Sequence, residues 1–253
     1  MSDIIIPYNR KPEMIFFDFG GTLFVDGKCR PADGFAALLQ AAENPDAADK
    51  DALAALWDEY LEDAEPVNGD GGAHLEIPLS AVLTYAEMTT GLRVPLPMTE
   101  QEELFDRYNS TREAIEGVSA FLGALKKLGI RAAVISNNMM SGASLALAVK
   151  RWLPSSDMEF CLTSADILFM KPDAHLFRTA AKYAGVDPAR CWYCGDGFHP
   201  DVKGALGAGM LPVLFDPNAE KPLSTKKYGE AVYLLINRWD ALREYLAAIS
   251  VFD

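Results

Sequence analysis

The chain of 253 residues is half apolar and carries 36 Asp and Glu against 23 Lys and Arg, a formal net charge of −13. Its length predicts one large α/β domain, or a core domain with a smaller insertion. The negative charge argues against nucleic acid or an anionic membrane as a partner. No apolar run approaches the ~20 residues of a membrane span, and the N-terminal run of three isoleucines ends at Pro7, so we expect a cytoplasmic protein.

The stretch Met14–Phe24 is the first predicted element of the core. Its apolar residues lead to the single carboxylate of Asp18, and the chain then turns through two glycines and a threonine. A short apolar run that ends in a turn is typical of a strand buried on both faces of a parallel sheet. Ligands bind beyond the carboxyl ends of such strands, which makes Asp18 a candidate catalyst. The alternative is an aspartate that stabilises only the turn.

The negative charge is concentrated in residues 26–112, which hold 18 Asp or Glu and 6 Lys or Arg. This segment contains no convincing strand. Apolar residues at spacings of three and four predict helices, over residues 35–43, 50–64, 79–90 and 100–113. We therefore predict a separate, acidic and all-helical unit at 26–112, inserted between residues 1–25 and 113–253 of the core.

From residue 118 onward, helix and strand signals alternate. Strands are predicted over Ile130–Ile135, Met158–Thr163, Cys191–Gly195, Pro212–Phe215 and Val232–Leu235. The helices around them are predicted over Val118–Leu128, up to about Trp152, His175–Ala184, Val202–Gly207 and Asp240–Ile249. This alternation predicts an α/β fold whose parallel sheet is joined by right-handed crossovers.

Polar residues follow several of these predicted strands. Ser136 and Asn137 open a helix, where a hydroxyl and backbone amides make an anion site, although Ser136 could equally be a helix cap. Lys171 precedes Pro172 near another strand end and could hold a phosphate, although most lysines are solvated surface groups.

Two further carboxylates, Asp196 and Asp201, follow the predicted strand Cys191–Gly195. If they converge with Asp18, the three carboxylates would hold Mg²⁺, a hard cation that takes oxygen ligands. The alternative is that Asp196 belongs to a turn and Asp201 caps its helix. That alternative explains each residue singly, but not why all these polar clusters follow strands at one predicted edge of the sheet.

Taken in order, these clusters resemble the four motifs of the haloacid dehalogenase-like hydrolase superfamily. The matching segments are Asp18-Phe-Gly-Gly-Thr22, Ser136-Asn137, Lys171-Pro172 and Gly195-Asp196 with Asp201, supported by Thr163–Pro172 and Gly204–Met210. The helical unit falls where many members of the superfamily carry a cap domain. The resemblance implies a Rossmann-like core and a Mg²⁺-dependent hydrolase that acts on a small phosphorylated metabolite. Monomer and homodimer both stay open.

The resemblance also implies a role for each matching residue. Asp18 would be the nucleophile and would form an aspartyl-phosphate that water later hydrolyses. The phosphoryl group would be bound by Ser136, the backbone amide of Asn137 and Lys171, together with Gly21 and Thr22. Mg²⁺ would be held by Asp18, the backbone carbonyl of Gly20 and Asp196, with Asp201 as a ligand or as a support for the ligands.

One position departs from the family pattern. Family phosphatases usually carry a second aspartate two residues after the nucleophile, where this chain has Gly20. That aspartate supplies general acid–base catalysis, worth typically ~10²–10⁴-fold. The substrate could have a leaving group of low pKa that needs no acid, or His74 or His199 could supply the proton.

Two other interpretations also fit the missing aspartate. Hydrolases of C–P bonds that resemble phosphonoacetaldehyde hydrolase lack it too, and they use a cap lysine, for which only Lys28 and Lys50 are available here. A phosphate-binding or regulatory protein with little turnover is the interpretation from a different class. A 2-haloacid dehalogenase fits less well, because it would not need Asp196 and Asp201.

Overall fold

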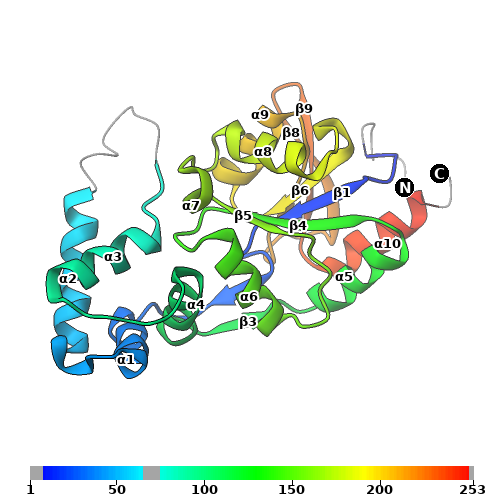
Figure 1. Ribbon diagram of the computed structural model, residues 1–253. Helices are drawn as coiled ribbons and strands as arrows, with labels where there is room; N and C mark the ends of the chain where they lie inside the picture. Colours follow the sequence, from blue (N-terminus) through cyan, green and yellow to red (C-terminus); the bar gives the residue numbers. More distant parts are fainter. Residues whose placement is uncertain (1–7, 65–74, 251–253) are drawn as a thin grey trace.

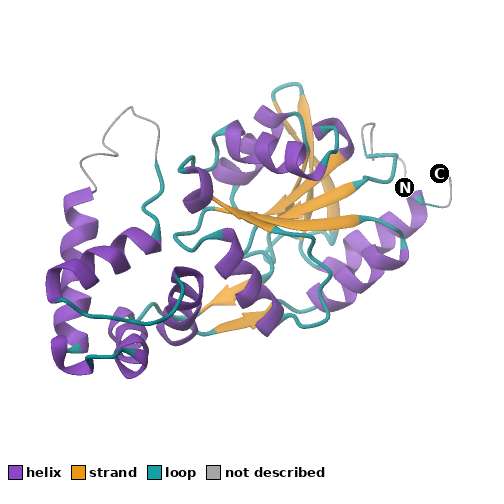
Figure 2. Cartoon of the chain, in the orientation of Figure 1, coloured by secondary structure: helices purple, strands orange, loops and turns teal. Residues whose placement is uncertain are grey.

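The computed structural model describes residues 8–64 and 75–250, and its centre is a seven-stranded sheet of order β5-β4-β1-β6-β7-β9-β8 (Figures 1 and 2). The strands are β1 (Met14–Phe17), β4 (Arg131–Ser136), β5 (Cys161–Thr163), β6 (Cys191–Gly195), β7 (Leu211–Phe215), β8 (Leu223–Tyr228) and β9 (Ala231–Ile236). Neighbouring strands run parallel except at the β8–β9 edge. The predicted α/β fold is therefore confirmed.

The antiparallel edge strand β8 is the element of this sheet that the sequence prediction lacks. Its residues Leu-Ser-Thr-Lys-Lys-Tyr are half-buried or exposed, so no apolar run marks it. It pairs with β9 across Gly229, whose φ of 58° lies in the left-handed region that glycine adopts without strain. Polar residues and lysines are common on edge strands, where they discourage pairing with other chains.

Helices cover both faces of the sheet (Figure 1). One face is covered by α5 (Val118–Lys127), α6 (Gly142–Trp152) and α10 (Trp239–Ile249), and the other by α8 (Ala174–Ala184) and α9 (Gly204–Ala208). Successive residues of a strand point to opposite faces. Phe17 thus packs against Phe121 and Trp239, whereas Phe16 lies in the second core with Phe177.

Shorter helical turns connect these elements. They are the 3₁₀ turns η1 (Pro45–Ala47) and η3 (Pro188–Arg190), the short helix α7 (Ser164–Ile167) and the π-helix η4 (Phe198–Lys203). The predicted helix Val202–Gly207 is in fact two segments, because η4 leads directly into α9. This places Asp201 inside a π-helical turn and not at a helix N-terminus.

A helical cap lies beside the sheet, at the left of Figure 1. It is made of α1 (Pro31–Ala41), α2 (Lys50–Ala64), α3 (Leu79–Thr90) and α4 (Met98–Asn109). Its core contains Phe35, Trp57 and Phe105, and the last two rings stack at 5.3 Å. On α4, Glu102 accepts a hydrogen bond of 2.5 Å from Ser144 of α6 and so ties the cap to the core.

Two short strands carry the chain out of the core and back: β2 (Phe24–Asp26) and β3 (Arg112–Ala114). They pair antiparallel, with Asp26 opposite Arg112, at the two ends of the segment for which no strand is predicted. Three residues per strand leave too short a pattern for recognition from sequence. The exact borders of the cap, at residues 25/26 and 112/113, stay a prediction.

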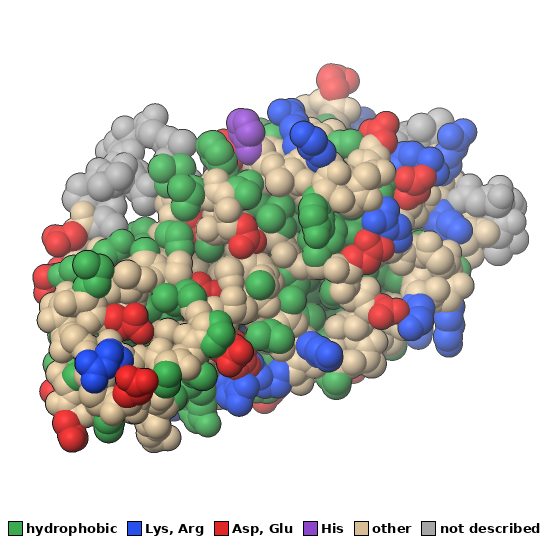
Figure 3. All heavy atoms as spheres, viewed as in Figure 1, with side chains coloured by type: hydrophobic (Ala, Val, Ile, Leu, Met, Phe, Trp, Pro, Cys, Tyr) green, Lys and Arg blue, Asp and Glu red, His purple; other side chains and the backbone are tan. Residues whose placement is uncertain are grey.

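The basic side chains are distributed unevenly between the core and the cap. On the face shown in Figure 3, Lys and Arg side chains gather over the sheet-bearing region, and few lie over the cap end. Within the described ranges 8–64 and 75–250, no helix is both long and apolar enough to cross a membrane.

Candidate active site

A pocket of about 400 Å³ opens at the carboxyl ends of β1, β4 and β6. Its lining includes the core residues Asp18, Ser136, Asn137, Lys171, Asp196 and Asp201, as well as Asn109 and Ser110 from the end of α4. Phe17, the last residue of β1, is in register with Val134 of β4 and Cys194 of β6. This register brings the residues that follow the three strands together, so the predicted polar edge of the sheet forms one pocket.

Lys171 lies at the centre of the site. Its Nζ is 2.8 Å from Asp18 Oδ1 and 2.7 Å from Asp201 Oδ1. Its side chain is 3% exposed, and those of Asp18 and Asp201 are 13% and 2% exposed. One buried cation thus bridges two carboxylates that are 183 residues apart in sequence.

Tyr193 is a member of this cluster that the sequence analysis missed. Lys171 Nζ donates a hydrogen bond of 2.9 Å to the Tyr193 hydroxyl, which lies 3.0 Å from both Asp201 Oδ1 and the carbonyl oxygen of Ile135. Tyr193 belongs to the buried strand β6, where a tyrosine is easily taken for a packing residue. The signal that could have revealed it is its phenol, the one hydroxyl group in that strand. A buried hydroxyl group needs hydrogen-bond partners.

Asn137 holds the backbone of Lys171. Its Oδ1 accepts a hydrogen bond of 2.6 Å from the Lys171 amide, and its Nδ2 donates one of 3.1 Å to the Lys171 carbonyl. This reciprocal pair fixes the lysine beside the end of β4. The neighbouring Ser136 is 3% exposed and lines the same pocket.

Burial and neighbouring charges shift the pKa values of these groups in a common direction. Burial raises the pKa of Asp18 to about 6, and Asp201 adds to the rise while Lys171 opposes it. Burial alone would lower the pKa of Lys171, but Asp18 and Asp201 more than offset this and raise it. The lysine is therefore a permanent cation. Burial also raises the pKa of Asp196.

Carboxylate oxygens of Asp18, Asp196 and Asp201 all lie within 4.8 Å of one another. An all-oxygen donor set of this kind suits Mg²⁺. Both oxygens of Asp201 already accept hydrogen bonds, Oδ1 from Lys171 and Oδ2 from the amide of Gly197 at 2.7 Å. The carboxylates of Asp18 and Asp196 are thus the better placed of the three to bind an ion directly.

The Gly-Gly-Thr turn after Asp18 is packed tightly. Gly21 has a φ of 67°, and a Cβ there would collide with the carboxylate of Asp196, so the position requires glycine. The Thr22 side chain is completely buried, and in the described part of the chain its hydroxyl has no hydrogen-bond partner. Neither residue lines the pocket, so their predicted contact with phosphate stays a prediction.

Among the described residues, the other candidate side chains of the sequence analysis, His199 and the two cap lysines, do not line the pocket. His199 is exposed and does not line it, and His74 lies outside the described residues. The two cap lysines are also exposed: Lys50 pairs with Asp51 at 2.7 Å, and Lys28 does not line the pocket. The geometry therefore offers no support for a cap-lysine mechanism.

A second buried ion cluster stands where the cap joins the core. Arg112 donates from Nη1 and Nη2 to Asp106, at 2.6 and 2.8 Å, and from Nε to Asp26 Oδ1 at 2.7 Å. Asp106 is buried, but the Asp26 side chain is 43% exposed. Asp26 and Arg112 both line the pocket, and sequence analysis gave no signal for either.

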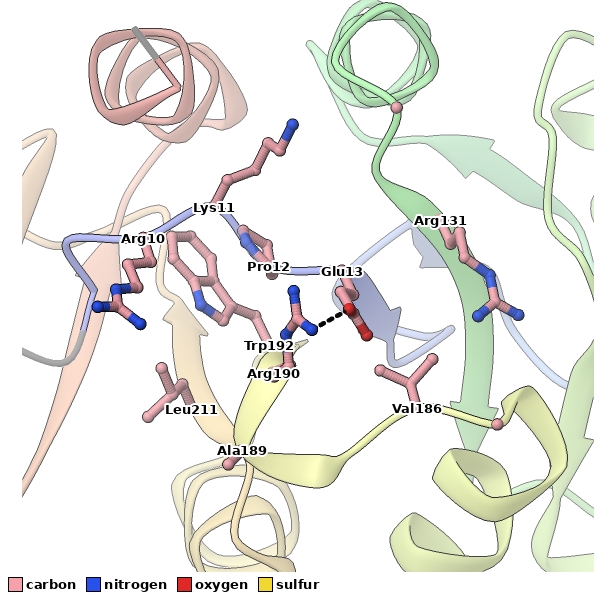
Figure 4. A pocket seen from close by; sticks show the side chains of 12 residues that line it. Arg10, Lys11, Pro12, Glu13, Arg131, Val186, Ala189, Arg190, Trp192 and Leu211 are labelled. Carbon is pink, nitrogen blue, oxygen red and sulfur yellow. Dashed lines mark ion pairs between the residues drawn. The ribbon is translucent and has the colours of Figure 1, made fainter. Parts of the chain in front are cut away.

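A larger hollow of about 1180 Å³ lies at the opposite, amino ends of the strands (Figure 4). Figure 4 shows Arg10, Arg131 and Arg190 around it, with Arg190 paired to Glu13. None of the predicted site residues lines this hollow. The pocket lined by the four strand-end clusters, and not the larger hollow, is therefore the candidate active site.

Comparison with known proteins agrees with this geometry. A family model for haloacid dehalogenase-like hydrolases matches residues 12–209. Because the match covers most of the chain, the chain belongs to the haloacid dehalogenase-like hydrolase family. The match also includes the cap and all the strand-end clusters described above.

Individual relatives are similar over shorter stretches. The chain is 32% identical over 117 residues to the haloacid dehalogenase-like hydrolase domain-containing protein 3 of Bos taurus. The aligned stretch covers 43% of each chain. It is 30% identical over 135 residues to the putative phosphatase YhcW of Bacillus subtilis, covering 53% of this chain and 54% of that one. The chain thus spans about half the length of the curated relatives it matches.

Solved structures match over nearly the whole chain. A 2-haloacid dehalogenase from Pseudomonas syringae has a TM-score of 0.56 at 23% identity, covering 94% of this chain and 99% of that one. A HAD phosphatase from Thermococcus onnurineus has a TM-score of 0.53 at 19% identity, covering 92% and 97%. These likenesses confirm the fold, including the helical cap.

Proposed function

We propose that the chain is a Mg²⁺-dependent phosphatase of small phosphorylated metabolites that works through an aspartyl-phosphate on Asp18. The observation that carries this proposal is the placement of the Asp18 carboxylate in one pocket with a buried lysine and the carboxylate of Asp196. A nucleophilic carboxylate, a fixed cation and an oxygen-lined cation site are what phosphoryl transfer needs, because its catalysis is mostly positioning and charge stabilisation.

Each residue of the site has its own role in the proposed reaction. Asp18 attacks phosphorus, while Lys171, Ser136 and the amide of Asn137 bind the phosphoryl oxygens. Asp201 and Tyr193 both accept hydrogen bonds from Lys171 Nζ, so they position its ammonium group. Asp18, Asp196 and the carbonyl of Gly20 would hold Mg²⁺, which when bound neutralises charge on the phosphoryl group.

The names of two relatives agree with phosphatase activity. YhcW is described as a putative phosphatase, and a protein of Methanothermobacter thermautotrophicus, 30% identical over 96 residues, is described as a glyceraldehyde 3-phosphate phosphatase. The metal-site carboxylates favour phosphoryl transfer over dehalogenation, because a dehalogenase has no use for a cation site.

The charges of the pocket indicate a substrate with one anionic group. Among the described residues that line it, the cations are Lys171 and Arg112, and both are paired with carboxylates. Residues 65–74, which the structure does not describe, add no Lys or Arg to the cap. A bisphosphate would therefore bring a second charge for which the pocket has no free counterion.

The test is an assay of the purified protein with Mg²⁺ against acyl phosphates and a panel of phosphomonoesters. We expect wild-type protein to release phosphate and Asp18→Asn to release none, because the amide cannot act as the nucleophile. Asp157→Asn, which changes an exposed aspartate that does not line the pocket, is the matched control and should keep wild-type activity.

A different class of function, phosphate-ester binding with little turnover, is favoured by Gly20 alone. If no substrate class turns over while Asp18→Asn still changes ligand binding, the phosphatase proposal is wrong and the binding function stands. The same protein preparations decide between the two, because binding can be followed by calorimetry with inorganic phosphate.

A further inference from the structure

The space beside Gly20 is filled by a carboxylate from another element. A Cβ placed on Gly20 would stand 2.5 Å from Oδ2 of Asp26. Gly20 occupies the position where family phosphatases usually carry their second aspartate. The side chain missing from the turn is thus replaced in space by that of Asp26, which follows six residues later at the end of β2.

Asp26 lines the pocket and is held through one of its two carboxylate oxygens. Arg112 binds Oδ1 through its Nε at 2.7 Å, and its two other nitrogens are bound to Asp106. No donor in the described ranges binds Oδ2. Asp26 lines the same pocket as Asp18 and Lys171, and its side chain is 43% exposed. The carboxylate is therefore fixed through Oδ1, and its side chain is exposed enough for water to reach it.

A carboxylate in this space could act on either chemical step of the reaction. Departure of a leaving group that is stable as an anion needs no proton. Attack of water on the phosphorylated intermediate, in contrast, needs a group that accepts a proton from the water.

We infer that Asp26 is the general base that activates water for hydrolysis of the aspartyl-phosphate, in place of the aspartate missing at Gly20. This inference rests on the proposed phosphatase function. The water oxygen bonds to phosphorus, and the bond between phosphorus and the Asp18 oxygen breaks with its electron pair left on Asp18. The proton of the water passes to Asp26 Oδ2 and then to solvent, and inorganic phosphate is released.

The experiment measures the two chemical steps separately in the full chain with Mg²⁺ and 4-nitrophenyl phosphate, whose leaving group needs no acid. In Asp26→Asn, we expect a burst of nitrophenolate near one equivalent per chain, followed by a steady rate about 10²–10⁴-fold below wild type. Mass spectrometry after acid quench should find the phosphoryl group on Asp18. Asparagine preserves the hydrogen bond from Arg112.

Glu113→Gln is the matched control. Glu113 is the neighbouring acidic residue on the same two-stranded ribbon, but it is exposed and does not line the pocket. It should show the wild-type steady rate and no accumulated phosphoprotein. An unfolding curve of each variant excludes a folding defect as the cause of a slow rate.

A second pair of variants tests whether a carboxylate in the space beside Gly20 is what hydrolysis requires, whichever residue supplies it. Asp26→Ala removes the carboxylate, and adding Gly20→Asp to it returns a carboxylate to the same space from the turn. We expect the double variant to recover most of the steady rate lost in Asp26→Ala. Gly20→Asp alone should not exceed wild type, because its Cβ meets Asp26 Oδ2.

The outcomes separate this inference from the proposed function. A wild-type steady rate in Asp26→Asn, or an equal loss of burst and steady rate, would show that Asp26 is not the base, even though Asp18 is phosphorylated. If wild-type protein releases no nitrophenolate above the Asp18→Asn background, and Asp26→Asn carries no phosphoryl group on Asp18 after acid quench, the phosphatase proposal itself fails and the role of Asp26 fails with it.

Discussion

Two buried cations in this molecule each bind two aspartates, and they differ in what they leave free. Lys171 lies wholly within the core, and both of its carboxylate partners are at most 13% exposed. Arg112 joins the core to the cap, with Asp106 buried and Asp26 43% exposed. The lysine is a point charge aimed at a phosphoryl group, whereas the planar guanidinium fixes the orientation of two side chains. The Lys171 cluster is suited to bind an anionic phosphoryl group, whereas the Arg112 cluster orients the carboxylate of Asp26.

Removing the cation of the core cluster should have the largest effect. Lys171→Met leaves Asp18 and Asp201 buried without their counterion, so we expect the free energy of unfolding to fall by about 3–5 kcal/mol. Phosphatase activity should also be lost. Urea titration with a metal chelator present measures the stability.

Lys150→Met is the control for this change, because Lys150 is an exposed residue of α6. Its effect should stay within about 0.5 kcal/mol. Unchanged stability in Lys171→Met would contradict the buried ion cluster.

Replacing the cation of the cap junction should have a smaller effect. Arg112→Lys keeps the charge but cannot bind Asp106 and Asp26 together through a planar fork. We expect a loss of about 1.5–3 kcal/mol, the range for a hydrogen bond to a charged group. The steady hydrolysis rate should fall as in Asp26→Asn, with the burst retained.

Arg107→Lys tests whether the fork matters only when it is buried. Arg107 lies on α4 and pairs with Glu103, but its side chain is 48% exposed. This exchange should change stability by less than about 0.5 kcal/mol. If Arg107→Lys and Arg112→Lys lowered stability equally, burial of the guanidinium would not explain the effect at residue 112.

The smallest effect is a difference in thiol reactivity between the cap side and the core. Cys29 is exposed at the pocket, whereas burial raises the pKa values of Cys161 and Cys191 to about 12 and that of Cys194 well above its usual range. Because the thiolate is the reactive form, iodoacetamide at pH 8 should label only Cys29 in the native protein. Cys29→Ser should abolish native labelling, and labelling of a core thiol before unfolding would contradict the buried core.

Much of the site could be predicted because its residues follow strands. Asp18, Ser136 and Asp196 each come directly after an apolar run, and parallel strands bring such positions to one edge of a sheet. The helical cap could be predicted from the periodicity of its apolar residues. β2, β3 and β8 could not, because three-residue strands and polar edge strands leave no distinctive pattern.

The sequence by itself determined the order of the motifs, the α/β fold and the absence of an aspartate at Gly20. Only the tertiary structure decided which group fills the space beside that glycine. Asp26 looks like one of many acidic residues near a linker until its partner Arg112, 86 residues away, pairs with it across β2 and β3. Tyr193 likewise gains its role only from contact with Lys171. Local patterns specify elements, but the partners of a buried polar group come from distant segments, and folding alone brings them together.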